Sequence, residues 1–222
     1  MKEGKQMIIT PRLKKIADLI PKGSRLADIG TDHGFLPIYL LKNNIIEYAV
    51  CSDIKKGPLA NAEKNIRKYG FEQKTRLCLA DGLSGVLPGE ADTAVIAGMG
   101  GEMIATILEN GIPEGMSKFF LQPMRNIDVL RRKMHSLGLK ITGEMLIKEK
   151  DKFYIIICAE KGSETPWKDD EYIVSPFLKK EPLWAEYAAK EKKKFLRNLE
   201  ELEKSDDEEK KTVIKKLVKL YE

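Results

Sequence analysis

The feature of this sequence that most restricts its fold is a repeated alternation between short apolar runs and longer amphipathic segments. The apolar runs have the length of β-strands and cover residues 25–29, 49–53, 76–80, 93–97 and 118–122. Segments with helical spacing follow at about residues 35–43, 58–69, 101–109 and 126–137. Strands separated by helices of this length form βαβ units, so the spacing predicts a mostly parallel sheet with helices on both faces.

The last two strand-like runs of the sequence have no helical segment between them. Residues 139–147 and 152–160 are two further strand-like runs, and only Lys148-Glu-Lys-Asp151 separates them. Runs this close in sequence pair as an antiparallel hairpin. A mostly parallel seven-stranded sheet, an α/β arrangement that ends in an antiparallel hairpin, is typical of the class I Rossmann-like methyltransferase fold. Before the first strand, Thr10-Pro11 predicts a helix start and Pro21-Lys-Gly23 its end.

The last part of the chain is helical in character and short of strand formers, and Gly162-Ser-Glu-Thr-Pro166 indicates a boundary before it. Ser205-Asp-Asp-Glu208 is a capping-box pattern that predicts the start of a final helix. The preceding helix carries one apolar stripe, formed by Trp184, Ala188, Phe195, Leu199 and Leu202. We therefore predict a methyltransferase domain with its N-terminal helix over residues 1–162, and a coiled-coil-like helical hairpin over residues 163–222.

The turn after the first strand, Asp28-Ile-Gly-Thr-Asp-His-Gly34, is the most informative about a cofactor. Ligands of such sheets bind beyond the carboxyl ends of the strands, and Gly30 allows close approach of the backbone. The complete G-x-G-x-x-G pattern that binds a pyrophosphate is absent, which disfavours NAD and FAD. S-adenosylmethionine has no phosphate but carries a cationic sulfonium and an amino-acid tail. Asp28 and Asp32 suit those groups.

Acidic residues also follow the second and third strands. Asp53, with Ile54 beside it, lies 23 residues after Gly30 and can accept hydrogen bonds from both hydroxyls of a ribose. Asp81 can receive the exocyclic amine of an adenine, and Gly82 leaves room for the ring. Three acids at the ends of three successive strands predict a nucleoside-containing cofactor, most of all S-adenosylmethionine.

The fourth strand ends in Ala97-Gly-Met-Gly-Gly101, where enzymes of this fold place the methyl acceptor. The segment lacks the Asn/Asp-Pro-Pro-Tyr/Phe pattern that clamps an exocyclic amine, and the chain has no Pro-Cys pair for covalent attack on a pyrimidine. Gly98 would lie against the cofactor, whereas Gly100 and Gly101 would let a flat group approach, with Met99 as a polarizable wall. The alternative is a tight strand-to-helix turn that needs small residues.

Three segments together resemble the bacterial tRNA (adenine-22-N1)-methyltransferase family, TrmK: Ala27-Asp-Ile-Gly-Thr-Asp-His33, Ile96-Ala-Gly-Met-Gly-Gly101 and Leu121-Gln-Pro123. The resemblance covers nearly the whole chain. It implies methyl transfer from S-adenosylmethionine to N1 of an adenine in the D-arm region of tRNA. Asp32 would act on the adenine, with His33 as its partner; the alternatives are helix capping for Asp32 and a structural hydrogen bond for His33. The family often has asparagine where this chain has Met124. The residues that would hold the cofactor are Asp28, Gly30, Asp53, Asp81 and Gly82.

The net charge of +5 suits a polyanionic partner such as tRNA, although ordinary solvated lysines would give the same bias. Basic residues cluster in two places, first at Lys2, Lys5, Arg12, Lys14 and Lys15 and then at Arg125, Arg131, Arg132 and Lys133. We expect the arginines of both clusters to contact tRNA phosphates. The helical hairpin would act either as a second jaw on the tRNA or as a stabilising or dimerising element. The expected oligomeric state is a monomer or a weak homo-oligomer, with no obligate protein partner.

Other classes of protein receive little support. No apolar run approaches the roughly 18 residues that span a membrane, and no secretory signal is present, so a cytoplasmic location is expected. The three cysteines are far apart, and the sequence indicates neither a disulfide framework nor a metal site. Three alternatives stay open: a small-molecule N-methyltransferase, a non-catalytic protein that binds S-adenosylmethionine or RNA, and a nucleotide-dependent oxidoreductase.

Overall fold

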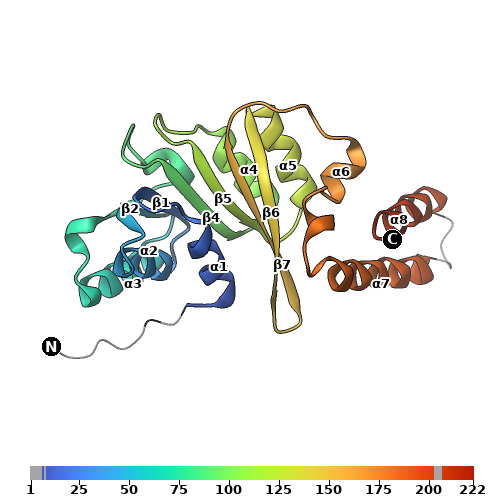
Figure 1. The fold of residues 1–222 in the computed structure, drawn as a ribbon, viewed down its shortest axis with the longest axis horizontal. Helices are drawn as coiled ribbons and strands as arrows, with labels where there is room; N and C mark the ends of the chain where they lie inside the picture. The colour runs from blue at the N-terminus through green and yellow to red at the C-terminus, as the bar shows by residue number, and fades with distance from the viewer. Residues whose placement is uncertain (1–6, 8, 203–206) are drawn as a thin grey trace.

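The computed structural model describes residue 7, residues 9–202 and residues 207–222, and its centre is a seven-stranded sheet (Figure 1). The strand order is β3-β2-β1-β4-β5-β7-β6, in which the first five strands are parallel and β7 runs antiparallel to both of its neighbours, β5 and β6. This confirms the predicted class I fold. The strands are β1 (Ser24–Ile29), β2 (Ile46–Asp53), β3 (Thr75–Leu79), β4 (Thr93–Met99), β5 (Lys118–Pro123), β6 (Leu139–Glu149) and β7 (Lys152–Lys161).

Two apolar cores lie on opposite faces of the sheet. Neighbouring strand residues point to opposite faces, so Ile96 belongs to one core and Val95 to the other. Helices α4 (Gly101–Glu109) and α5 (Ile127–Ser136) cover the first face. The second face is covered by α1 (Pro11–Leu19), α2 (Phe35–Lys42) and α3 (Lys56–Tyr69). Because both faces are buried, the strands carry continuous apolar runs.

The predicted helix ends agree closely with the structure. Thr10 is the N-cap of α1, where its hydroxyl accepts a hydrogen bond from the Leu13 backbone N–H. The last helix, α8 (Glu208–Leu220), begins after Asp207, whose carboxylate accepts from the Lys210 N–H over 3.0 Å. Asp207 is thus the cap, and the predicted capping residue Ser205 lies outside the described residues. No helix within the described residues is both long and apolar enough to cross a lipid bilayer.

Residues 163–183 pack back onto the sheet before the helical hairpin begins. Sequence patterns did not predict α6 (Asp169–Ile173) or the 3-10 turn Leu178–Lys180 within this segment. Leu178 is buried in the same core as α4 and α5, so the segment is tied to the body of the molecule. The division of the chain at residue 162 stays a prediction.

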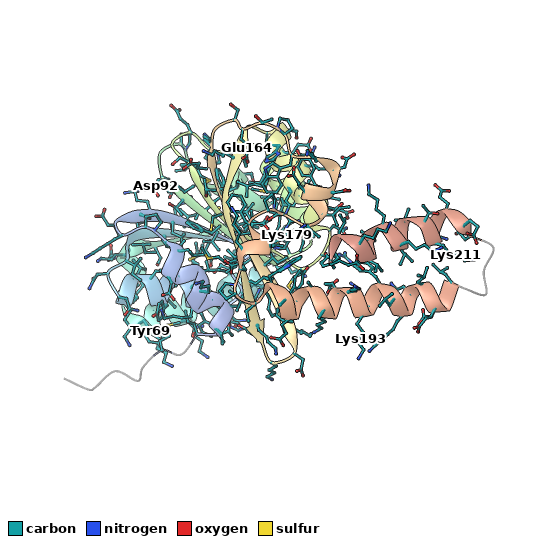
Figure 2. All side chains as sticks on the ribbon, turned by 45° about the vertical axis from the view of Figure 1, so that its right-hand side comes forward. Tyr69, Asp92, Glu164, Lys179, Lys193 and Lys211 are labelled. Carbon is teal, nitrogen blue, oxygen red and sulfur yellow. The ribbon has the colours of Figure 1, made fainter. Side chains whose placement is uncertain are left out.

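The helical hairpin consists of α7 (Trp184–Leu202) and α8, which lie side by side and project away from the sheet (Figures 1 and 2). At its base Tyr221 stacks on Trp184, with 5.9 Å between ring centroids and 17° between ring planes. Tyr187 and Phe195 pack on the same tyrosine. This aromatic cluster, formed by Trp184, Tyr187, Phe195 and Tyr221, fastens the end of the chain to the start of α7.

Candidate active site

A cleft of about 470 Å³ opens where β1, β2 and β4 end, which is within the size range of small-molecule sites. It brings together most of the predicted cofactor residues, namely Gly30, Asp53, Ile54, Asp81 and Gly82. Their convergence follows from topology, because the carboxyl ends of neighbouring parallel strands share one edge of the sheet. Two other residues predicted to hold the cofactor, Asp28 and Gly98, lie outside the lining of this cleft.

Two glycines of the cleft have a left-handed backbone conformation that favours glycine. Gly30 has φ +76°, and a Cβ added there would lie 2.2 Å from Met99 Cε. Gly82 has φ +57°, and an added Cβ would lie 2.8 Å from Ile107 Cγ2. Met99, predicted to face the acceptor, therefore lies against Gly30 and lines the cofactor cleft. A larger residue at either position would strain the backbone, and at position 82 it would also collide with Ile107.

The lining of the cleft suits a nucleoside. The carboxylates of Asp53 and Asp81 can accept hydrogen bonds from hydroxyl and amino groups, and Asp53 Oδ1 already accepts from the Lys55 N–H over 2.7 Å. Ile54 and Met103 are large apolar side chains that are 64% and 59% exposed, and both line the cleft. A flat base between them would remove this apolar surface from water. The hydrogen-bond acceptors and the apolar walls of the cleft therefore fit the nucleoside of S-adenosylmethionine.

Sequence analysis missed the contribution of α4 to this cleft. Glu102, Thr106 and Asn110 all line it. They are spaced four residues apart, so they share one face of the helix while its buried residues face the core. A polar stripe at this spacing was visible in the sequence and could have indicated a helix face that lines a site.

Asp28 is buried beneath the turn that carries Gly30. Burial raises the pKa of its carboxyl group from 3.8 to about 6, with a smaller contribution from the nearby charge of Asp53 and an opposing one from the Thr31 hydroxyl. The folded protein therefore holds this proton more tightly than the unfolded chain does. The carboxyl group is nevertheless mostly ionised at neutral pH, and this buried charge lowers the stability of the folded protein. Such destabilising charges are common at functional sites.

We expect Asp28→Asn to stabilise the cofactor-free protein at pH 7.5 by at most about 3 kcal/mol, from two pKa units at 1.36 kcal/mol each. Well below pH 3.8 the carboxyl is protonated in both states and the gain vanishes, whereas between pH 4 and 6 the gain grows with pH. Urea unfolding at pH 4, 5 and 7.5 measures it. Glu47→Gln, which changes an exposed acid near the amino end of β2, is the matched control. A gain that does not change with pH would contradict the burial argument.

Asp32 and His33 lie together on the other side of Gly30, at the rim of a smaller pocket of about 210 Å³. The Asp32 side chain is 71% exposed, and its Oδ2 is 3.3 Å from His33 Nε2. The His33 ring stacks on Phe35 with 5.1 Å between centroids. The N-cap of α2 is Gly34 in a left-handed conformation, without a side-chain cap, so Asp32 does not cap this helix. Its carboxylate points into solvent beside the cleft.

The loops after β4 and β5 are joined by two backbone hydrogen bonds. The Gly101 N–H donates to the Arg125 carbonyl and the Met124 N–H to the Met99 carbonyl, both over 2.8 Å. A Cβ added to Gly101 would lie 2.1 Å from the Asn126 oxygen, so the packing of the loops accounts for this glycine. At Gly100 an added Cβ would meet the exposed Arg125 side chain at 3.4 Å.

The two basic clusters are not continuous surfaces. Arg131 is 1% exposed and forms two 2.7 Å hydrogen bonds with the buried carboxylate of Glu144, so the prediction that it contacts phosphate is wrong.

The exposed Arg132 lies over the Tyr172 ring and pairs with Asp169. Lys14 pairs with Asp18, and Lys133 with Glu109. Lys2 and Lys5 lie outside the described residues. Arg125 is exposed next to the acceptor loop.

Arg12 is half-buried at the start of α1, on the side that faces the smaller pocket. It lines the smaller pocket with Asp28, Asp32 and His33. Its side chain is hydrogen-bonded to Gln122 and lies over the Tyr154 ring. Neither Gln122 nor Tyr154 was predicted from the sequence as a partner of Arg12. A polar residue at the end of an apolar strand, as Gln122 is in Leu121-Gln-Pro123, could have indicated a residue of the site. Among the described residues no group of three or more His, Cys, Asp or Glu side chains could hold a metal ion.

Comparisons with known proteins agree with this geometry. A family model described as "Methyltransferase domain" matches residues 9–157. The tRNA (adenine(22)-N(1))-methyltransferase of Bacillus subtilis (strain 168) is 33% identical over 183 residues, which cover 79% of this chain and 77% of the relative. A crystal structure of a Streptococcus pneumoniae protein, assigned as a tRNA (m1A22) methyltransferase, has a TM-score of 0.91 at 30% identity and covers 96% of this chain and 98% of that chain. M. capricolum TrmK in complex with S-adenosyl-homocysteine has a TM-score of 0.85 at 28% identity, with 97% and 96% covered.

Proposed function

The chain belongs to the bacterial tRNA (adenine-22-N1)-methyltransferase family, and from this membership we propose that it forms 1-methyladenosine at adenine 22 of tRNA. Its cofactor is S-adenosylmethionine. The observation that carries the proposal is the B. subtilis relative, together with a cleft whose acids suit a nucleoside and which opens beside Asp32. No observation favours the small-molecule or non-catalytic alternatives.

S-adenosylmethionine, when bound, supplies a methyl group on a cationic sulfur that a nitrogen lone pair can attack. In our proposal Asp53 holds the ribose hydroxyls and Asp81 the adenine amine, while Gly30 and Gly82 let the cofactor approach the backbone. Adenine N1 has an in-plane lone pair, so no base is needed to create the nucleophile. Placement of the two reactants by the walls of the site would then supply much of the rate.

We assign the catalytic role to Asp32, with His33 as the group that orients it. Methylation at N1 makes the base cationic, and a carboxylate near its N6 amine would stabilise that charge or accept a proton. The position of Asp32 supports this role, because the carboxylate is exposed beside the cleft and does not cap α2. The stacked pair of His33 and Phe35 offers an aromatic surface close to it.

The target adenine lies within folded RNA, so the enzyme must extrude it or distort its surroundings. We propose that Arg125, exposed beside the acceptor loop, contacts a phosphate near the target, and that Arg132 contributes more weakly because Asp169 already pairs with it. We also propose a methyltransferase domain over 1–162, a helical domain over 163–222, a cytoplasmic location where tRNA is found, and no obligate protein partner.

The test uses purified protein, S-adenosylmethionine and two tRNA transcripts that differ only in adenine or guanine at position 22. Nucleoside mass spectrometry of the products is expected to find 1-methyladenosine in the adenine transcript alone. Equal methylation of both transcripts would contradict the assignment of position 22. If a labelled methyl group entered only small metabolites of a cell extract, the tRNA activity itself would be disproved.

A further inference from the structure

A further cavity lies between the loop after β5 and helix α7. It is a groove of about 520 Å³, which is within the size range of small-molecule sites. Its walls come mainly from residues 123–128, residues 152–155 at the start of β7, and α7. None of the described residues that line it also lines the cofactor cleft or the smaller pocket. The sheet and the helical hairpin therefore form this groove together, apart from the cofactor.

Three cations of the groove are available to a ligand. Arg125, Lys152 and Lys190 line it with exposed side chains, and none of the three forms an ion pair with a carboxylate of the described residues. Lys190 donates a hydrogen bond to the Asp151 carbonyl, which holds its ammonium group beside β7. An ammonium group has three donors, so the other two can still bind an anion.

Most other charges of the groove are already paired. Glu191 lines it and pairs with Lys194 over 3.2 Å, and the lining Arg131 is neutralised by Glu144. Asp128 is the other acid of the lining, and it forms no ion pair within the described residues. The unpaired charge that remains is therefore mostly positive, which favours an anionic ligand such as a nucleic acid.

Aromatic rings make up much of the inner surface of the groove, which Phe153, Tyr154, Tyr187 and Tyr221 line. Phe153 and Tyr187 meet at 63°, with 5.6 Å between ring centroids, and Lys190 Nζ lies 5.5 Å from the centroid of Phe153. Phe153 is only partly buried, so part of its ring is accessible. Rings beside cations suit an unpaired nucleotide, because its base stacks on a ring and its phosphate meets a cation.

Two side chains connect the groove to the active site. Arg125 lines the groove, and its Nε would lie 3.4 Å from a Cβ added to Gly100 in the loop after β4. Tyr154 also lines the groove, and Arg12 lies over its ring with 5.3 Å from Cζ to the centroid. Arg12 in turn lines the pocket that has Asp32 at its rim. A nucleotide in the groove would thus be near an adenine held beside Asp32.

We propose that this groove binds an unpaired nucleotide that adjoins the target adenine in the tRNA strand, an inference that rests on the proposed function. Extrusion of the target breaks its stacking on the neighbouring bases. A neighbour that stacks on Phe153 recovers part of that energy, while Lys152 and Lys190 contact its phosphate. Stacking tolerates every base, so the groove adds affinity and placement without selecting a sequence.

Removing the ring and the base in turn tests this contact. Two tRNAs each carry one abasic nucleotide, on the 5′ or the 3′ side of position 22, and fluorescence anisotropy measures their binding to full-length wild type and Phe153→Leu. For the wild type we expect one of the two abasic changes to lower affinity on the order of 10-fold, as for a lost base–aromatic stack. Phe153→Leu should bind intact tRNA as weakly, and the same abasic change should then cost less than about twofold more.

The phosphate contact has a separate signature. Lys190→Gln should weaken intact and abasic tRNA equally and reduce the salt dependence of binding by about one unit of slope. Lys193→Gln is the matched control, because Lys193 is an exposed cation on the same helix that does not line the groove. Calorimetry should find the affinity of every variant for S-adenosylhomocysteine within about twofold of wild type, because the groove and the cleft share no described lining residue.

Unchanged affinity of Phe153→Leu for intact tRNA would overturn the proposal. So would losses that add for the ring and for both abasic changes, because ring and base would then act independently. A loss confined to Lys190→Gln would also overturn it, in favour of a phosphate contact without a base. These outcomes leave the proposed function intact as long as the wild type methylates the intact tRNA. If the wild type methylated no tRNA, the proposed function itself would fail.

Discussion

Asparagine in place of Asp32 is expected to lower the rate constant of methyl transfer by about 100-fold or more, while cofactor affinity and stability stay nearly unchanged. The substitution keeps the shape of the side chain and removes its charge. It would remove the group that stabilises the cationic adenine or accepts its proton, and such groups contribute about 10²- to 10⁴-fold. Asp32 is exposed, and the N-cap of α2 is Gly34, so the fold does not depend on its carboxylate.

Single-turnover methylation of the adenine-22 transcript, with protein in excess, isolates the chemical step from tRNA release. Calorimetry with S-adenosylhomocysteine and a thermal melt show that the Asp32→Asn variant is folded and binds its cofactor. Glu47→Gln is the matched control, because Glu47 is an exposed acid near the amino end of β2, away from the site. A single-turnover rate within about twofold of wild type would refute the catalytic role of Asp32 and leave it an exposed loop residue.

The fold was predictable because the information that specifies it is local. Alternating apolar runs and helical segments depend on neighbouring residues, and the sheet follows from them with few alternatives. The acids of the cleft were predictable for a related reason. Asp53 and Asp81 each follow a strand, and parallel strands end at one edge, so sequence order alone brings them together.

Interactions between distant segments were not predictable in this way. Arg131 lies in a basic run that resembles a surface, yet it follows Ile127 by four residues and adjoins the buried Leu130, so it is on the inner face of α5. Its partner Glu144 comes from β6 and leaves no local signal. The contact between Arg12 and Gln122 joins residues 110 positions apart, and α6 is only five residues long. These two contacts and this short helix form only when the sheet has brought the distant segments together.

Replacing Arg131 with methionine is expected to lower the free energy of unfolding by about 3–5 kcal/mol, the usual cost of breaking a buried ion pair. Glu144 is 3% exposed, and loss of the guanidinium would leave its carboxylate with the Ser175 hydroxyl as a neutral hydrogen-bond partner. The carbonyl groups of Tyr172 and Ile173 would lose their donors from Arg131 as well. For a chain of this length the melting temperature should fall by roughly 6–20 °C.

Urea unfolding and thermal melts measure this change, and Arg132→Met is the matched control on the same helix. The pair of Arg132 and Asp169 has side chains 43% and 82% exposed, so its loss should cost no more than about 1 kcal/mol. If the two variants were equally stable, the ion pair between Arg131 and Glu144 would not be a structural link. Hydrogen exchange would locate the loss, and we expect it first in residues 169–180.

The double variant Arg131→Met/Glu144→Met tests the reason for the effect. If the cost of Arg131→Met comes from a stranded carboxylate, removing that carboxylate should restore part of the stability, and the two changes should not be additive. Because residues 163–183 connect the sheet to α7, this pair also determines how the helical hairpin is attached. If Arg131→Met kept its affinity for the cofactor but no longer methylated tRNA, the attachment of the hairpin would be required for methylation of the tRNA substrate. A double variant less stable than Arg131→Met would contradict the argument.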